Sequence, residues 1–285
     1  MVDEHVSVLG VRDEPVLLRF LEGRPDTTMF LRANLRKAGI EDRGARFQGT
    51  YVGAWRDGEI VGAASHCWNG NLLLEAPAAL EEVVRHAVRA SRHDLRGLIG
   101  PWDQCLTALK ALDAEDRPRQ TFSREALFAL DLSDLRVPRP LHAGEVQVRP
   151  ATRADVGDFM TDWEVAYEVE ALGTEPGDEL RAQAQASLEA NLGNGWILEQ
   201  AGRPVSMSSF NAALPDCVQI GGVFTPPEDR NRGFAACTVA GSLLAAREQG
   251  VRRTILFTGD DNPAAQACYR GLGYEQVGDY GIVLF

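Results

Sequence analysis

The hydrophobic pattern of the second half of the chain predicts a regular succession of strands and helices. Residues 217–224 and 253–258 are apolar, partly β-branched runs typical of strands, and 234–249 is apolar on most sides, which indicates a buried helix. A proline in the first turn and a glycine at the end delimit a helix over 263–272. The other expected elements are strands at 146–149, 196–199 and 205–210, helices at 154–171 and 178–192, and a closing hairpin of 274–277 with 281–285.

The first half of the chain shows a similar but fainter order. Its pattern predicts strands at 6–11, 50–55, 60–67, 71–74 and 95–99, and helices at 14–21, 28–38, 78–90 and 102–112. A similar order at the spacing of one domain indicates a duplication, although no residue-level repeat is obvious. Two prolines and a glycine mark residues 131–144 as a linker. We therefore expect an α/β fold with mixed sheets, in two domains at 1–130 and 145–285.

Composition narrows the classes of function. A length of 285 residues suits two domains of ordinary size. Residues 145–285 hold 10 basic and 20 acidic side chains and so carry −10 of the net charge of −12, which disfavours binding to nucleic acid. No apolar run is long enough to span a bilayer, and the first residues are not patterned as a signal peptide. The five cysteines are scattered without a C-x-x-C pair, so we expect a cytoplasmic protein with no metal site and no membrane partner.

The segment 223–246 carries the clearest chemical signal. A strand runs into a polar turn and a long apolar helix, and Arg230-x-x-Gly233-x-Ala235 spans the turn and the helix start. Small residues let backbone N–H groups approach a ligand, and a first helical turn offers unpaired N–H groups at its positive end. These features predict a pyrophosphate cradle, to which Arg230 and Arg232 add positive charge. The alternative is a helix start that only needs a glycine turn; the segment is neither a P-loop nor a G-x-G-x-x-G fingerprint.

Two stretches, TPPEDRNRGFA at 225–235 and ILFTGDDNPAAQACYRGLGYE at 255–275, resemble the GNAT acetyltransferase superfamily. That family has an R/Q-x-x-G-x-G/A loop, then a strand, an Asn, and a helix with a Tyr just before a Gly-aromatic turn. The same features occur here in order, with Ala235 in place of the commoner glycine. The resemblance covers about 145–285 and is strongest over 218–280. It implies two GNAT-like acyltransferase domains in tandem, the first of them degenerate.

The resemblance implies acetyl-coenzyme A as the cofactor, with its pantetheine arm along 217–224. The backbone N–H of Val223 would stabilise the oxyanion of the tetrahedral intermediate, and Tyr269 would protonate the departing thiolate. For Tyr269 the alternative is a packed ring with its hydroxyl in solvent. Asn262 is expected to be the N-cap of its helix in either case, with a cofactor contact as the second possibility. The residues expected to bind the cofactor are Val223, Thr225, Arg230, Asn231, Arg232, Gly233, Phe234, Ala235 and Asn262.

The general base is not evident from the resemblance. Some GNAT enzymes have a Glu four residues before the oxyanion-binding position, where this chain has Gln219, which cannot act as a base and could only position a water. The base would then be a water or a carboxylate from the acceptor-binding helices. Residues 155–179 carry nine acidic side chains and no Lys or Arg, and such a run would attract a cationic amine and accept its proton. A solvated helix face is the alternative for most of the nine. We nominate Glu168 and Glu170 as catalytic carboxylates, with Trp163 and Tyr167 as pocket walls or packing residues.

The sequence as a whole predicts an N-acyltransferase. It would move an acetyl or short acyl group from coenzyme A to a primary amine of a small molecule or peptide through a ternary complex, and we expect this acceptor to be cationic. The first domain has EAPAALEEV at 75–83 instead of the cradle, so it would not bind the cofactor and would cover the acceptor site or complete the sheet. A non-catalytic acyl-coenzyme-A sensor and a protein that uses the fold alone are the alternatives. Tyr269 favours the enzyme, and the oligomeric state stays open.

Overall fold

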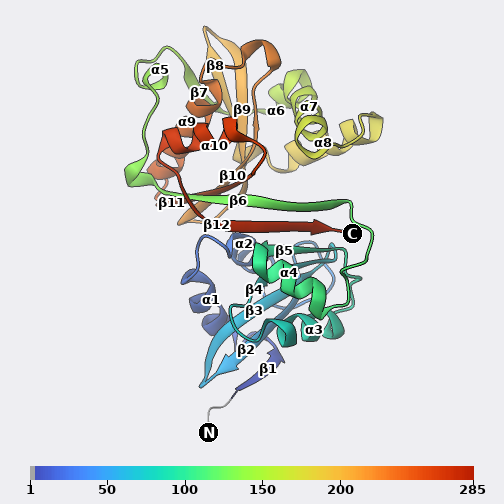
Figure 1. Ribbon diagram of the computed structural model, residues 1–285. Coiled ribbons are helices and arrows are strands. Elements are labelled where there is room, and N and C mark those ends of the chain that lie inside the picture. Colours follow the sequence, from blue (N-terminus) through green and yellow to red (C-terminus); the bar gives the residue numbers. More distant parts are fainter. Residues whose placement is uncertain (1–3) are drawn as a thin grey trace. The chain divides into compact units, whose positions relative to one another are not determined.

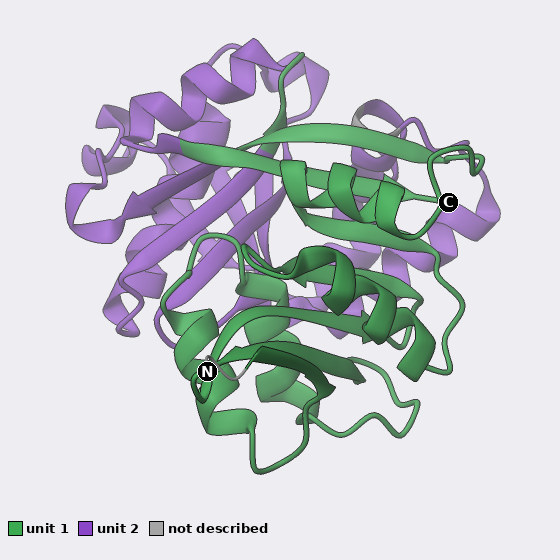
Figure 2. Cartoon of the chain, turned by 60° about the horizontal axis from the view of Figure 1, so that its bottom comes forward, with its two compact units in different colours: residues 1–127, 258–261, 277–285 green, residues 128–257, 262–276 purple. Residues whose placement is uncertain are grey.

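The computed structural model describes residues 4–285; residues 1–3, where the first predicted domain begins, lie outside the described part. By its contacts the chain divides into two compact units, which Figure 2 distinguishes by colour. Unit 1 holds the residues up to Leu127, Thr258–Asp261 and Val277–Phe285, and unit 2 holds Phe128–Phe257 and Asn262–Gln276. The expected α/β class is confirmed. The predicted domain limits, 1–130 and 145–285, stay a prediction. They place residues 277–285 in the second domain, whereas the contacts of these residues place them in unit 1.

The sheet of unit 1 is covered by helices on both faces (Figure 1). Its strand order is β1-β2-β3-β4-β5-β12, where β1 is Glu4–Val8, β2 Gly49–Arg56, β3 Glu59–Cys67, β4 Asn71–Glu75, β5 Gly97–Pro101 and β12 Glu275–Leu284. β4 and β5 are parallel and the other neighbours antiparallel. Because side chains alternate along a strand, Tyr51 packs with α1 (Glu14–Glu22) and α2 (Met29–Ala38), and Val52 packs with α3 (Leu80–Ala90) and α4 (Trp102–Ala111).

The predicted closing hairpin of 274–277 with 281–285 is wrong. The structure has one strand, β12, whose segment Tyr280–Leu284 pairs antiparallel with Gly97–Pro101 of β5. A Cβ on Gly281 would lie 2.8 Å from Sγ of Cys105 on α4. This glycine therefore permits close packing of a helix on the strand.

Unit 2 has the strand order β11-β10-β9-β8-β7, with β10 and β11 parallel and the other neighbours antiparallel. Its strands are β7 Gln147–Pro150, β8 Gly195–Gln200, β9 Arg203–Ala213, β10 Cys217–Phe224 and β11 Arg253–Gly259. β6 (Thr121–Asp131) and the short helix α5 (Arg139–His142) precede them in the chain. The helices are α6 Arg153–Asp155, a π-helical turn Val156–Met160, α7 Thr161–Leu172, α8 Asp178–Ala190, α9 Phe234–Glu248 and α10 Pro263–Leu272.

Two apolar clusters hold the helices of unit 2 on opposite faces of its sheet, as Figure 1 shows for α7 and α9. Ile197 and Met207 pack toward the π-helical turn and α7, whereas Leu198 and Val205 pack toward the start of α9. The neighbouring positions thus alternate between the two cores, as in a strand buried on both sides. Between residues 4 and 285, no helix has the length and apolar character that crossing a bilayer requires.

Candidate functional site

The loop between β10 and α9 is held in shape by a buried carboxylate. Asp229 is 2% exposed and accepts two hydrogen bonds from Arg203 at 2.7 and 2.8 Å and one from Arg232 at 3.0 Å. Hydrogen bonds from Arg203 keep the pKa of Asp229 below its ordinary value, so the carboxylate stays ionised. The paired arginines fix the loop before it enters the helix. The sequence reasoning missed Asp229, because a single acid in a polar turn carries no local signal of burial.

The loop ends in a helix N-terminus that no side chain caps. Gly233 is the N-cap of α9, with φ +76°, and no side chain of the helix start satisfies the first N–H groups. A Cβ placed on Gly233 would meet no atom within 4 Å, so the space beside this residue is open. The first turn therefore offers unpaired N–H groups and the positive end of the helix dipole to that space. That an anion binds there stays a prediction.

The guanidinium groups of the two loop arginines, Arg230 and Arg232, are each held by contacts with neighbouring residues. Arg230 donates from Nε to the carbonyl oxygen of Thr225 at 3.0 Å and pairs with Glu170 of α7 at 2.7 Å. Arg232 lies over the ring of Phe234, with 4.5 Å from its Cζ to the ring centroid, besides its bond to Asp229. Both guanidinium groups keep substantial exposure, 41% and 45% of the side chain. They therefore add positive charge beside the helix start while remaining open to solvent.

β10 separates from its parallel neighbour before it reaches the loop. Its registered pairs with β11 run from Cys217–Arg253 to Gln219–Ile255 and end there, although the strands have eight and seven residues. On its other side, Gly221 pairs with Ser209 and Phe224 with Met207, so Gly222 and Val223 lie opposite the single residue Ser208. Two residues against one is a β-bulge, which leaves one residue outside the ladder of hydrogen bonds. The predicted oxyanion residue Val223 thus sits in a bulge.

Tyr269 lies on α10, and its environment keeps the phenol protonated. The side chain is 8% exposed, and its ring meets that of Tyr274 edge-on with 5.8 Å between the centroids. Burial, with smaller contributions from Cys268 and from Tyr167 of α7, raises the pKa of Tyr269 above its ordinary value. A phenol in this state can donate a proton throughout the neutral range.

Asn262 has the N-cap role that the sequence predicted. Its Oδ1 accepts a hydrogen bond from the backbone N–H of Ala265 at 3.0 Å at the start of α10. The contact of Asn262 with a cofactor stays a prediction.

The acidic run of residues 155–179 divides into paired and unpaired groups. Asp155 binds Arg149 through two hydrogen bonds of 2.7 and 2.8 Å, and Asp162 pairs with Arg181. Glu170 is engaged by Arg230, as described above. These acids hold elements together, so they contribute less negative field at the site than the sequence suggested.

Glu164 is the acid of the run that lies against the bulge. Its Oε2 is 3.9 Å from the position that a Cβ on Gly222 would occupy, next to Val223. Burial, and then the negative charge of Glu168 one turn further along α7, raise the pKa of Glu164 to about 7. The sequence showed Glu164 as one acid among nine and gave no reason to prefer it.

The remaining predicted side chains are placed as follows. Trp163 packs in the core, with its ring centroid 4.6 Å from that of Phe159 and 6.2 Å from that of Phe224. Gln219 is 2% exposed and its Oε1 has no hydrogen-bond partner within residues 4–285. Glu168 is half-buried and its Oε2 accepts a hydrogen bond of 3.4 Å from Thr174.

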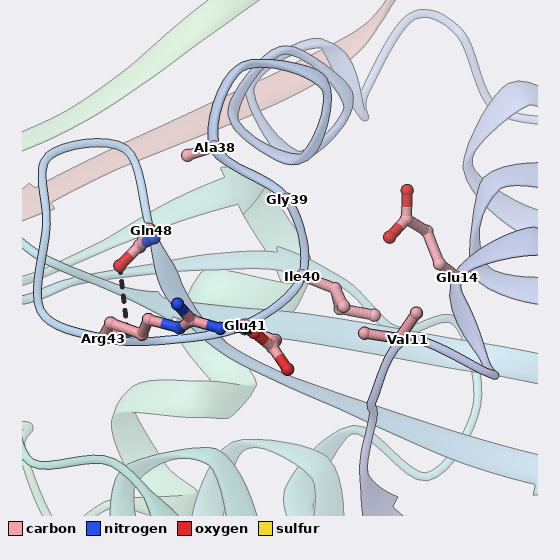
Figure 3. Close-up of a pocket in the computed structure, with 8 residues that line it drawn as sticks. All are labelled: Val11, Glu14, Ala38, Gly39, Ile40, Glu41, Arg43 and Gln48. Carbon is pink, nitrogen blue, oxygen red and sulfur yellow. Dashed lines mark hydrogen bonds and ion pairs between the residues drawn. The ribbon is translucent and has the colours of Figure 1, made fainter.

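In unit 1 the helix that corresponds to α9 in the order of elements is α3, and its N-terminus has different residues. This helix begins after Ala79, at φ +53°, and carries Glu81 and Glu82 in the first turn. Unit 1 also contains a pocket of about 280 Å³, shown in Figure 3, whose lining includes Glu14, Ile40 and Gln48 but none of the predicted site residues. In the described part of the chain, no three His, Cys, Asp or Glu side chains are grouped to hold a metal ion.

Comparisons with known proteins identify the fold of the chain and a family match for one segment of unit 2. Residues 157–274 match the family model described as "Acetyltransferase (GNAT) family". No curated protein matches the chain by sequence. Among solved structures, a GNAT-family acetyltransferase from Colwellia psychrerythraea is 13% identical, with a TM-score of 0.55 over 99% of this chain and 98% of that one. A GCN5-related N-acetyltransferase from Kribbella flavida is 19% identical, with a TM-score of 0.54 over 93% and 94% of the two chains.

A tandem GNAT protein from the clavulanic acid biosynthesis pathway is 13% identical, with a TM-score of 0.50 over 99% of this chain and 97% of that one. At such identities these structures share a fold with the chain and nothing finer. Coverage of nearly the whole length is consistent with two GNAT-like units, as the sequence predicted. Residues 157–274, which contain both the α9 loop and Tyr269, match the GNAT acetyltransferase family model, so this segment is a GNAT-type acetyltransferase domain.

Proposed function

We propose that unit 2 binds acetyl-coenzyme A and transfers its acetyl group to a primary amine of a small molecule or peptide. The observation that carries this proposal is the uncapped start of α9 at Gly233, with open space beside that residue, next to a strand that leaves its neighbour after Gln219. The pyrophosphate would lie against the N–H groups of Gly233, Phe234 and Ala235, with Arg230, Asn231 and Arg232 around it. The pantetheine arm would lie along the edge of β10 that faces away from β9, from the end of its pairing with β11 to Val223, and would reach Thr225 just after the strand.

The residues of the chain then have distinct tasks. Acetyl-coenzyme A supplies the activated acetyl group as a thioester. The N–H of Val223, which lies in the bulge, would donate a hydrogen bond to the carbonyl oxygen as that oxygen gains negative charge. Tyr269, kept protonated by burial, donates its proton to the sulfur that leaves. Asn262 orients the start of the helix that carries Tyr269.

Glu170 has a different task from the one that its sequence position suggested. Its ion pair with Arg230 at 2.7 Å occupies the carboxylate, so we assign it to holding the pyrophosphate loop against α7. The negative charge of Glu168 raises the pKa of Glu164, so we keep Glu168 on the acceptor side of the proposed site. The acceptor is then an amine that approaches along α7.

A thiol-release assay with acetyl-coenzyme A across a panel of primary amines tests the proposal. We expect thiol release that depends on the amine, formation of the N-acetyl product, and calorimetric binding of one acetyl-coenzyme A per chain. Binding without turnover on any amine would favour a sensor, and two cofactor sites per chain would contradict the assignment to unit 2 alone.

A further inference from the structure

The amine must lose a proton before or as it attacks, and one carboxylate of unit 2 is placed to take it. Glu164 projects from α7 to the bulge of β10, where its Oε2 lies 3.9 Å from the Cβ position of Gly222. Gly222 directly precedes Val223, whose N–H is the proposed partner of the reacting carbonyl oxygen. The hydroxyl of Ser209 lies at the same point, 2.8 Å from that Cβ position. Glu164 is thus beside the place where the new bond forms.

The other acids of the run are less suited to the task. Glu170 is held by Arg230, and Asp155 and Asp162 are held by arginines of β7 and α8. Among residues 4–285 no arginine or lysine is paired with Glu164, so its carboxylate is not neutralised by a fixed cation. Gln219, on the strand where some family members carry the base, has no titratable group and is buried.

The groups that face Glu164 set its affinity for a proton. Glu168 lies one turn along the same helix and repels its negative charge. From the sheet, Ser209 and the main chain of Gly222 approach it, and neither is charged. Tyr269 of α10 interacts with Tyr167 of α7 rather than with Glu164, and burial keeps the Tyr269 phenol neutral by raising its pKa. Burial and the single like charge together bring the pKa of Glu164 to about 7, where a carboxylate both takes and releases protons readily.

We propose that Glu164 accepts the proton of the acceptor's ammonium group and thereby selects strongly basic alkylamines as acceptors; this inference rests on the proposed acetyl transfer. The proton moves from the ammonium nitrogen to the Glu164 carboxylate, which frees the lone pair of the nitrogen. That pair forms the C–N bond at the thioester carbon, the C–S bond breaks with its electrons on sulfur, and the sulfur takes the proton of Tyr269. The nitrogen's second proton leaves to water as the amide forms, reprotonating the tyrosinate, and Glu164 returns its proton to solvent.

The shape of the pH profile tests this role. An alkylamine has a pKa near that of lysine, about 10.4, so it is an ammonium ion at neutral pH. For wild type, kcat/KM should rise with pH up to about 7 and then level off, because ionised Glu164 reacts with the ammonium form. In Glu164→Gln the plateau should disappear, and the rate should rise about tenfold per pH unit because only the neutral amine reacts. At pH 7 the loss should be about 100- to 10,000-fold.

Two comparisons separate this role from a structural one. Glu168→Gln removes the neighbouring charge, so the bend of the profile should move to lower pH. With an arylamine acceptor, which is largely neutral at pH 7, Glu164→Gln should lose much less activity than with an alkylamine such as n-butylamine. Binding of acetyl-coenzyme A, measured by calorimetry, should be unchanged in both variants.

Each outcome decides the inference. A plateau that survives in Glu164→Gln, or equal losses on the alkylamine and the arylamine, overturns the role of Glu164 while leaving acetyl transfer intact. A wild-type protein that transfers acetyl groups to no amine overturns the proposed function, and this inference with it. The measured profiles of the wild type thus distinguish the two failures.

Discussion

Replacing Gly233 by valine tests the cradle at the start of α9. Gly233 has φ +76°, and a Cβ there would meet no protein atom within 4 Å. The substitution therefore creates no clash inside the protein, and its structural cost is that of a β-branched residue at positive φ, about 1–2 kcal/mol. The new isopropyl group occupies the open space beside residue 233, where the pyrophosphate would lie.

Gly144 provides a matched control in the same unit. Its φ is +72° and a Cβ on it would also meet no atom within 4 Å. Gly144→Val should therefore cost the same backbone strain without touching the cradle. For a domain of this size, 1–2 kcal/mol corresponds to a fall in Tm of about 2–8 °C, which both variants should show.

The response to ligand should separate the two variants. Acetyl-coenzyme A at a hundred times its Kd should stabilise wild type and Gly144→Val by about 2.7 kcal/mol. Gly233→Val should show no such shift and no heat of binding by calorimetry. A ligand-induced rise in Tm in Gly233→Val as large as that of Gly144→Val would refute the placement of the pyrophosphate at this turn.

Three further predictions concern the acid, the field and the anchor of α6. Tyr269→Phe should lower kcat about 100-fold, with little change in acetyl-coenzyme A affinity or Tm, because the ring and its packing remain; a kcat preserved within a few-fold when chemistry limits would exclude the acid role. The kcat/KM for a diamine acceptor should fall as salt is raised, since screening weakens the acidic field, whereas a salt-independent rate would mean that the run is only solvated. Asp155→Asn should cost about 1–2 kcal/mol at pH 7, after allowance for the one-third exposure of Arg149, because Arg149 lowers the pKa of Asp155 from 3.8 to about 2. Since the folded pKa is the lower one, this contribution is present above about pH 4 and is lost as pH falls toward 2, so urea unfolding curves of variant and wild type should converge there.

Much of the local structure follows from the sequence because the signals lie within each element. The limits of β10 and α10 agree with prediction to the residue, and α10 has Pro263 in its first turn and Gly273 at its end. The hairpin expected from Tyr274 onward failed for a physical reason. The pairing of Tyr280–Leu284 with β5 is a contact with a strand far away in the sequence, and no local pattern specifies it.

The candidate site divides in the same way. The loop before α9, Tyr269 and Asn262 belong to short sequence motifs, so the elements on which they lie could be predicted from the sequence. Which acid of the run faces β10 depends on the rotation of α7 about its axis. The π-helical turn Val156–Met160 inserts a residue into the helix and so rotates everything after it. This rotation of α7 brings Glu164 to Gly222. The number of acidic residues in the run does not indicate which of them faces the strand.

The assignment of residues 277–285 to unit 1 has a consequence for biosynthesis. The strand that flanks β5 is made only after all of unit 2, roughly 150 residues later than β6 enters the chain. At about 5–20 residues per second, β5 waits on the order of ten to thirty seconds with one edge unpaired. Unit 1 is therefore completed only after unit 2 has been made, although most of unit 1 is encoded first, and its folding cannot finish in the order of synthesis.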